Sequence, residues 1–425
     1  MKILLKRSCV LLLLFFAAGF IHSLFAQDQA LRTIYPAGYK SNNLPYTPAV
    51  LAGGTLYVSG QGSLDAAGHM PQDFPGQVRQ ALENLQNVLR GAGMDFGNIV
   101  WLNVYLTDMG NLSAMNQVYW NTIGPNPPAR TILQVAALPA GQKVEVNCIA
   151  VADMQQRREI WPSGWKRSPH IDPPAILAGD VLYMSAQGDS NPVTGNRPSD
   201  FAGEIKQALD NVGDVLKAAN MSFKNVVWVN PYMEAGGRQA YGTMNKVYAT
   251  YFEFGNTPGR GTINVVGLPE GGHVVFSCIA GADLAKRKAV KPRNMPPSPT
   301  ASPGVVYGNT LYLSAKDGFI PDQGLVTSEF DLQLRQSMRN LLDGLQEADM
   351  DFSNVVWSTV YLRDMQDYGQ MNGLYKTFFQ GMFPARTTLQ QNFETGVPGA
   401  EQISFIAVGT QSAKGWKFLS QRSKS

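Results

Sequence analysis

Three arginines recur at equivalent places along this chain and are the first candidates for a chemical role. Each ends a Pro-x-Arg step, at Pro128-Ala129-Arg130, Pro258-Gly259-Arg260 and Pro384-Ala385-Arg386. A guanidinium group can donate two parallel hydrogen bonds to a carboxylate. An arginine that pairs with an acid at a domain boundary is the structural alternative, but three arginines in one register favour a ligand. We therefore expect these positions to bind a ligand.

Two further elements accompany each arginine and show that one unit is written three times. A Met-Asn-x-x-Tyr element precedes every arginine, at Met115–Tyr119, Met244–Tyr248 and Met371–Tyr375. Ahead of it stands a recurring tryptophan, at Trp101, Trp228 and Trp357. A period of roughly 128 residues is longer than the roughly 20–50 residues of a solenoid unit, so each copy should have its own core. The 425 residues suffice for about three ordinary domains.

Periodicity within one copy predicts an α+β domain. Ala49–Leu51 and Thr55–Ser59 flank Gly53-Gly54 and indicate a strand, a tight turn and a second strand. A helix should follow, because apolar residues recur at helical spacing: Val78, Leu82, Leu85 and Leu89. The full order, strand, strand, helix, strand, helix, strand, strand, predicts a mixed sheet with two helices on one face. The other copies would cover the second face, giving an intramolecular pseudo-trimer.

The domain boundaries follow from the repeats and from composition. We place domain 1 at residues 30–153, domain 2 at 158–284 and domain 3 at 289–411, with short linkers and a basic tail at 412–425. Residues 1–26 have the basic start, apolar run and small final residue of a signal peptide. We therefore predict a periplasmic or secreted protein, with an uncleaved anchor as the weaker alternative.

Charge and composition argue against several functional classes. The net charge is +3, from 35 basic and 32 acidic residues, and no basic run suits a nucleic acid. None of the four histidines recurs between repeats, and no Cys/His spacing suits a metal. Cys148 and Cys278 are equivalent, and Phe405 takes their place in repeat three, which indicates a buried apolar position rather than a disulfide. We predict no cofactor, no metal and no membrane span after signal cleavage.

The repeated residues also carry a family resemblance. Repeat one resembles the RidA/YjgF family of enamine/imine deaminases over its whole length, through Leu56–Gln61, Gln80–Leu85, Val104–Met109, Met115–Tyr119 and Pro128–Arg130. Repeats two and three match the same skeleton less closely. The resemblance implies a chorismate-mutase-like fold, and family members are usually homotrimers with clefts between subunits. Here one chain would build the trimer, so we expect a monomer.

The resemblance also implies a set of binding residues. In the family the Pro-x-Arg arginine binds the substrate carboxylate, and the resemblance implies the same role for Arg130, Arg260 and Arg386. Other contacts map onto Tyr46, Ser59 and Asn116, which we expect beside Arg130. Asn116 could instead cap or turn locally, and Ser59 could simply end its strand. Because Tyr46 aligns with Asp172 and Ala301 in the other repeats, the cleft of Arg130 is our first candidate.

The last strand of each repeat departs from the family. Its deaminases commonly have two glutamates here, two residues apart, of which the second holds or activates water. Repeat one has Glu145 and Asn147, and the other repeats lack both glutamates. Asn147 can hold a water but cannot take its proton. Arg130, Glu145 and Asn147 are thus the catalytic candidates, although the sequence favours a surface or interface charge for Glu145.

The resemblance implies hydrolysis of 2-imino or enamino acids to 2-oxo acids and ammonia, as in a 2-iminobutanoate/2-iminopropanoate deaminase. A non-catalytic periplasmic protein that binds small carboxylates is the alternative. Some family members are called ribonucleases, but near-neutral charge and the lack of a recurring His or Lys disfavour that activity.

Overall fold

The computed structural model describes residues 30–409, except residues 42, 235–236, 297, 322, 326 and 393–398. The predicted signal peptide at residues 1–26 and the basic tail at 412–425 lie outside this part of the chain. Among the helices that are described, none combines the length and the apolar character needed to cross a bilayer.

Each repeat forms a mixed β-sheet with two α-helices, so the predicted α+β class and the three tandem domains are confirmed. The strand orders are β1-β2-β3-β6-β4-β5, β12-β11-β14-β9-β8-β7 and β15-β16-β17-β22-β20-β21, with β10 and β13 attached to the second sheet and β18-β19 as a separate pair. In every sheet the last long strand lies in the middle, between the hairpin and the strand that carries the tryptophan.

The element bounds are as follows. Repeat one has β1 Arg32–Ile34, β2 Ala49–Ala52, β3 Thr55–Gly62, α2 Phe74–Gly91, β4 Ile99–Leu106, α3 Leu112–Ile123, β5 Ala129–Gln134 and β6 Val144–Val151. Repeat two has β7 Arg157–Ile160, β8 Ala175–Ala178, β9 Val181–Met184, β10 Gln187–Gly188, α4 Phe201–Ala218, β11 Val226–Met233, α5 Gly237–Tyr248, β12 Gly259–Arg260, β13 Ile263–Asn264 and β14 Val274–Gly281. Repeat three has β15 Arg287–Val290, β16 Gly304–Tyr307, β17 Thr310–Lys316, β18 Phe319–Ile320, β19 Gly324–Leu325, α6 Phe330–Glu347, β20 Val355–Leu362, α7 Tyr368–Tyr375, β21 Ala385–Gln390 and β22 Glu401–Val408.

Local sequence explains the long helix of each repeat. Asp73 caps α2 by accepting the N–H of Gly76 at 2.7 Å. The predicted apolar stripe of α2 is completely buried against the sheet. Just beyond the three long helices the backbone enters the left-handed region, at Gly93 (φ 71°), Asn220 (φ 57°) and Asp349 (φ 54°). These residue types tolerate that conformation best, as the sequence predicted.

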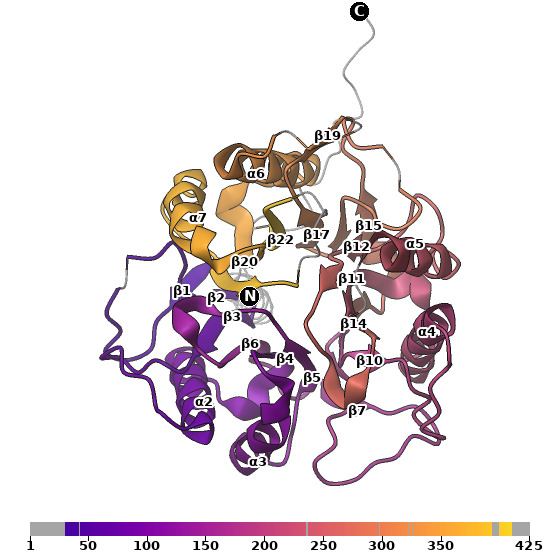
Figure 1. Ribbon diagram of the computed structural model, residues 1–425, viewed down its shortest axis with the longest axis horizontal. Coiled ribbons are helices and arrows are strands. Elements are labelled where there is room, and N and C mark those ends of the chain that lie inside the picture. The colour runs from indigo at the N-terminus through magenta and orange to yellow at the C-terminus, as the bar shows by residue number, and fades with distance from the viewer. Residues whose placement is uncertain are drawn as a thin grey trace, which may run out of the picture.

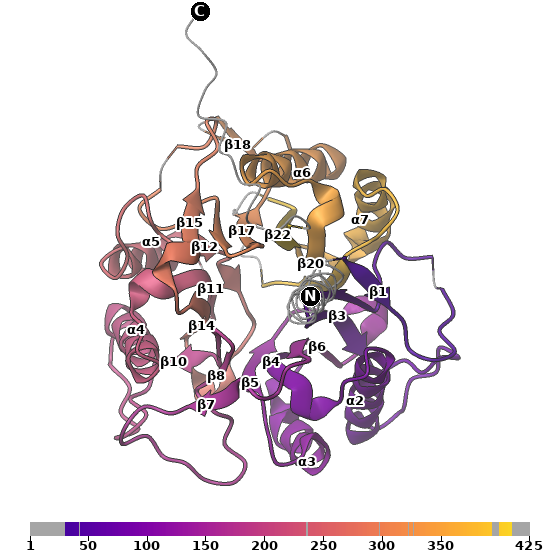
Figure 2. The same cartoon turned by 180° about the vertical axis from the view of Figure 1, so that it is seen from behind.

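The three domains form a ring around a shared core (Figures 1 and 2). The helices lie on the outside, and the opposite sheet faces meet at the centre. One buried apolar cluster draws on all three repeats, including Tyr57, Trp101, Tyr183, Trp228, Tyr312 and Trp357. Trp101 and Trp357 come from different repeats, and their rings pack edge to face with centroids 5.9 Å apart. The expectation that the copies cover each other's second sheet face is confirmed.

The arginine strands lie at the borders between domains. Each pairs in parallel with the tryptophan strand of its own repeat. Each also contacts the hairpin of the next domain: β5 meets β9, β12 meets β17, and β21 meets β3. Every arginine therefore faces a neighbouring repeat and not the hairpin of its own.

The linkers are more structured than expected. The segments that join one repeat to the next contain β7 and β15, which pair with the following hairpin as its outer strand. Cys148, Cys278 and Phe405 are all buried, which agrees with the expected buried apolar position, and the two cysteines are unbridged.

Candidate functional site

The best-equipped cleft lies between domains 3 and 1. It has a volume of about 460 Å³. Domain 3 contributes Arg386 and Tyr368, and domain 1 contributes Tyr46, Gly60 and Glu145. Two of the residues expected beside Arg130 therefore belong to the cleft of Arg386.

Arg386 is fixed through both its backbone and its side chain. Its backbone N–H donates to the hydroxyl of Ser59 at 2.8 Å, and that hydroxyl donates in turn to the carbonyl of Thr47. Its guanidinium donates to Asn372 Oδ1 at 2.5 Å, from helix α7. Ser59 is fully buried, so it positions the arginine strand across the domain border.

Aromatic rings surround the Arg386 guanidinium. The rings of Tyr46 and Tyr375 have centroids 5.2 and 5.1 Å from its central carbon. Among the described residues, no acidic side chain forms an ion pair with Arg386. The cleft thus holds a positioned cation that no acidic side chain of the described residues pairs with directly.

Glu145 supplies the acidic group of the same cleft. It lies on β6 and is only 5% exposed. Burial raises the pKa of its carboxyl to about 8, and the positive charge of Arg386 opposes that rise. Of the two alternatives, a surface charge is wrong because Glu145 is buried, whereas an interface charge agrees with its place in a cleft between domains 3 and 1.

Gly60 makes room for this carboxylate. A Cβ atom at Gly60 would lie 1.7 Å from Glu145 Oε1. The equivalent residues in the other repeats are Ala186 and Ala315, and there Val275 and Gln402 replace Glu145. The glycine and the glutamate thus occur together, in this cleft alone among the three.

Asn147, expected as a catalytic residue, lies elsewhere. Its amide donates to Thr387 Oγ1 at 2.7 Å, and its carbonyl accepts from Asn103 at 2.8 Å. It is fully buried in the polar layer where the sheets meet. Its assignment to the catalytic group is not supported. Asn147 lies two residues further along β6 than Glu145 and is held in the inner layer, whereas Glu145 lines the cleft.

The cleft of Arg130 is filled by the chain itself. Asp172 of domain 2 accepts from Arg130 Nε at 2.8 Å and lies 2.7 Å from its Nη2. The hydroxyl of Tyr119 donates to the same carboxylate at 3.1 Å. Asn116 accepts from Arg130 Nη1 at 2.9 Å, so it orients the arginine. The expected grouping of Arg130 with Tyr46, Ser59 and Glu145 is wrong, because β5 faces domain 2.

The third cleft lies between domains 2 and 3 and is open. It has a volume of about 550 Å³ and contains Arg260, Ala301, Lys316 and Gln402. The backbone N–H of Arg260 donates to Ser314 Oγ at 2.9 Å, which repeats the Ser59 contact. Its side chain donates to Asn245 Oδ1 at 2.8 Å and to the hydroxyl of Tyr241 at 3.1 Å. This cleft therefore has the arginine, but Ala301 stands in place of Tyr46 and Gln402 in place of Glu145.

Sequence reasoning missed Gly60, Lys316 and the role of Asp172. The signal was available in the alignment of the repeats. Asp172 stands where repeat one has Tyr46, and an acid at that position can satisfy an arginine. Gly60 becomes alanine wherever Glu145 is lost.

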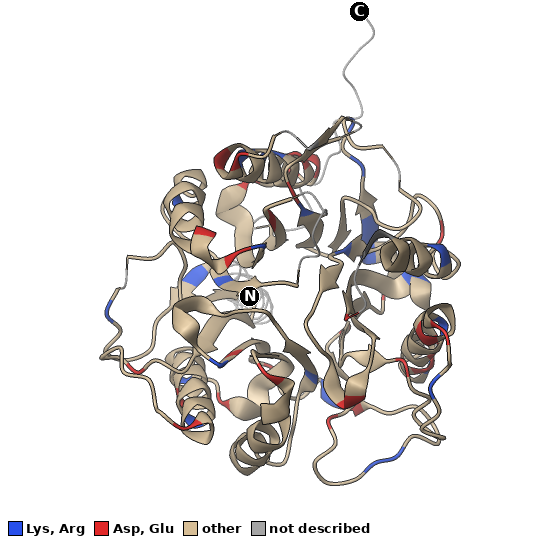
Figure 3. Ribbon diagram, in the orientation of Figure 1, with Lys and Arg blue, Asp and Glu red and all other residues tan. Residues whose placement is uncertain are grey.

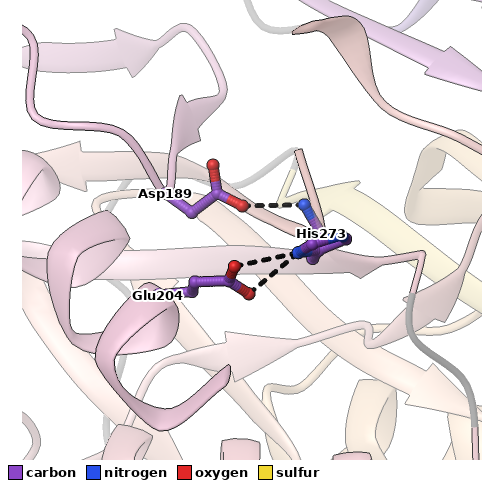
Figure 4. A group of neighbouring side chains, drawn as sticks. All are labelled: Asp189, Glu204 and His273. Carbon is purple, nitrogen blue, oxygen red and sulfur yellow. Dashed lines mark hydrogen bonds and ion pairs between the residues drawn. The ribbon is translucent and has the colours of Figure 1, made fainter. Parts of the chain in front are cut away.

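One other group of side chains has the types that bind metals. Asp189, Glu204 and His273 place ligand atoms within 4.8 Å of one another (Figure 4). However, His273 Nδ1 already lies 2.9 Å from Glu204 Oε1, and Arg197 Nε donates to Asp189 at 2.9 Å. These contacts explain the arrangement as a hydrogen-bonded group, and a neighbouring guanidinium disfavours a cation.

Charged residues are distributed over the whole molecule. Over the described residues, Lys and Arg alternate with Asp and Glu on the outer helices and loops (Figure 3). The positive stripe typical of nucleic-acid-binding surfaces is not seen there.

The sequence profile of the family described as Endoribonuclease L-PSP matches residues 40–152, 172–281 and 294–392. A 2-iminobutanoate/2-iminopropanoate deaminase of Capra hircus is 44% identical over 109 residues, which is 25% of this chain and 80% of the relative. Protein DfrA of Myxococcus xanthus is 43% identical over 112 residues, which is 25% of this chain and 86% of the relative. The solved structure of RidA from an Antarctic Psychrobacter species is 33% identical and covers 28% of this chain and 98% of its own, with a TM-score of 0.27.

Proposed function

Because the chain belongs to the RidA/YjgF (Endoribonuclease L-PSP) family, we propose that its Arg386 cleft hydrolyses small 2-imino or enamino acids to 2-oxo acids and ammonia. The observation that supports this most is the meeting of Arg386 from repeat three with Glu145 from repeat one in one cleft. Similarity to 2-iminobutanoate/2-iminopropanoate deaminases points to the same class of substrate.

Arg386 binds the substrate carboxylate, since its guanidinium is positioned and lacks an acidic partner among the described residues. Tyr46 and Tyr368 form the walls around that carboxylate. Binding at one end fixes the position of the imine carbon and nitrogen, which removes much of the entropy cost of the reaction.

Glu145 transfers the protons. With a pKa raised to about 8, its carboxyl is largely protonated at neutral pH and can donate to the imine nitrogen. Water then adds to the iminium carbon, and the resulting carboxylate accepts a proton from that water. Glu145 then donates this proton to the amino group of the tetrahedral intermediate, which leaves as ammonia, and takes up the proton of the hydroxyl group as that group becomes the carbonyl of the 2-oxo acid. This sequence needs no cofactor.

The test is imine hydrolysis, with the imine generated by an amino-acid oxidase. We expect Arg386→Ala and Glu145→Gln each to lower kcat/KM by at least about 100-fold. Arg260→Ala is the matched control, because it removes the equivalent arginine from the cleft without a glutamate and should leave the rate unchanged. Equal losses in the Arg260 and Arg386 variants would contradict the assignment of the site.

A protein that binds small carboxylates without turnover is the second candidate. The Arg260 cleft favours it, because that cleft has Gln402 in place of Glu145. Hydrolysis by the wild type no faster than the uncatalysed background would eliminate the enzymatic proposal. Calorimetric titration with 2-oxobutanoate would then measure whether binding remains and whether Arg386→Ala abolishes it.

A further inference from the structure

The Arg260 cleft contains a pair of residues that its two counterparts lack. Lys316 ends the second hairpin strand of repeat three, and Asp317 follows it. Both residues line the 550 Å³ cavity together with Arg260. At the same positions repeat one has Gln61-Gly62, and repeat two has Gln187-Gly188. The pair thus distinguishes this cleft by chemistry, and not only by size.

Lys316 has the properties of an amine nucleophile. Its side chain is half-buried, and within the described part of the chain no hydrogen bond or ion pair holds its ammonium group. Burial lowers the pKa of the Lys316 amine to about 8, and the neighbouring Asp317 only partly opposes this. About a tenth of the amine is then neutral at pH 7, which is the form that attacks a carbonyl.

The other groups of the cavity complete the requirements of one reaction. Asp317 follows Lys316 in the chain and lines the same cavity, and burial raises the pKa of its carboxyl. Arg260 has no acidic partner among the described residues and can bind a carboxylate. Ala301 stands where the first cleft has Tyr46, which leaves more room, and Gln402 cannot hydrolyse a bound imine as Glu145 could.

We propose that the Arg260 cleft captures small oxo acids as a Schiff base on Lys316. Arg260 binds the carboxylate of the ligand, and the Lys316 nitrogen attacks its aldehyde or ketone carbon. A proton moves from nitrogen to the former carbonyl oxygen, giving a carbinolamine. Asp317 protonates that hydroxyl, which leaves as water, and the product is an iminium paired with the Asp317 carboxylate. The step consumes no oxidant or reductant and reverses by hydration.

The test is reductive trapping on the full chain. The protein is incubated with pyruvate or with 4-oxobutanoate in the presence of cyanoborohydride, and adducts are located by intact mass and peptide mapping. We expect one predominant adduct at Lys316, and at least a tenfold loss of that adduct in Lys316→Gln, which restores the residue of the other two repeats. Lys316→Arg keeps the charge without the nucleophile and should behave in the same way.

Two further comparisons examine the partners of the lysine. Arg260→Gln should lower labelling by the oxo acids at least tenfold and leave labelling by butanal, which has no carboxylate, unchanged. Asp317→Asn should slow trapping by about 100-fold, the lower end of the range for general acid catalysis. Labelling should increase with pH through about 8, following the pKa of Lys316.

Labelling spread over exposed lysines, or labelling unchanged in Lys316→Gln, would overturn the proposal. It does not depend on imine hydrolysis at Arg386, because the two clefts share no residue. Lys316→Gln should therefore retain the wild-type hydrolysis rate, and failure of hydrolysis in the wild type leaves the trapping result independent.

Discussion

Replacement of Gly60 by alanine should separate the activity of the protein from its stability. The new Cβ would lie 1.7 Å from Oε1 and 2.6 Å from Cδ of Glu145. Carbon and oxygen atoms need roughly 3.5 Å, so the carboxylate must move by about 2 Å. A displacement of about 1 Å can lower a rate by about 100-fold, and we expect at least that loss in kcat/KM for imine hydrolysis.

The effect on folding should be much smaller. Overpacking usually costs about 1–3 kcal/mol, and the displaced group is the end of a flexible side chain that can turn into the cleft. We therefore expect about 1 kcal/mol of lost stability, measured by urea unfolding. The backbone at Gly60 does not require a positive φ, so the steric contact is the main cause.

A compensated variant provides the control. Gly60→Ala combined with Glu145→Val reproduces the Ala186 and Val275 pair of repeat two. It should recover the stability of the wild type but not its activity. A Gly60→Ala protein that hydrolyses imines at the wild-type rate would refute the reasoning, because the carboxylate would then not need its observed position.

Three further outcomes follow from the buried charges. Asp172→Ala should lower the free energy of unfolding by about 3–5 kcal/mol, because it leaves Arg130 buried without its partner. The same variant should bind one more carboxylate per chain in a calorimetric titration. An unchanged stoichiometry would contradict the view that Asp172 blocks the cleft. Glu145 should give kcat/KM a decline as pH rises through about 8, where its carboxyl loses the proton it donates, and a profile without that decline would argue against its role as the acid. Burial raises the pKa of Glu401 to about 8, and its Oε2 has no hydrogen-bond partner among the described residues. The stability it contributes is therefore complete below its unfolded pKa and is lost as pH rises through about 8. Urea unfolding at pH 5 and pH 8 should show a loss from Glu401 on the order of 3 kcal/mol. Glu401→Gln should remove this part and leave the loss due to Glu145, whose pKa is raised in the same way.

The fold could be predicted because the same sequence pattern occurs three times in the chain. Apolar spacing in three helices and tryptophans in three strands indicated the same domain each time. The amphipathic sheets also required a cover, and the other copies supplied it. These conclusions depend on local periodicity, which the sequence records directly.

The composition of each cleft could not be predicted in the same way. Alignment shows that Arg130, Arg260 and Arg386 are equivalent, but not which hairpin each one meets. That depends on the direction in which the domains follow one another around the ring. Tyr46 and Glu145 were therefore assigned to the arginine of their own repeat, whereas β21 brings Arg386 to them.

The sequence also could not show whether a residue near the end of a strand lies in the interior or in a cleft. Strand alternation places Glu145 and Asn147 on one side of β6, but it cannot distinguish the interior layer from a cleft. The structure does so through contacts, since Asn147 bonds to Thr387 and Glu145 has the open cavity before it.

The closure of the ring within one polypeptide has a consequence for how its clefts can change. In an assembly of identical subunits, every substitution enters all the clefts at once, and a change harmful to one is harmful to all. Here Asp172 occupies one cleft while Tyr46 remains in another. The neighbours of each cleft also stay tethered, so its two walls do not separate on dilution as those of dissociable subunits do. Substitutions can therefore change one of the three interfaces while the other two keep the ring folded.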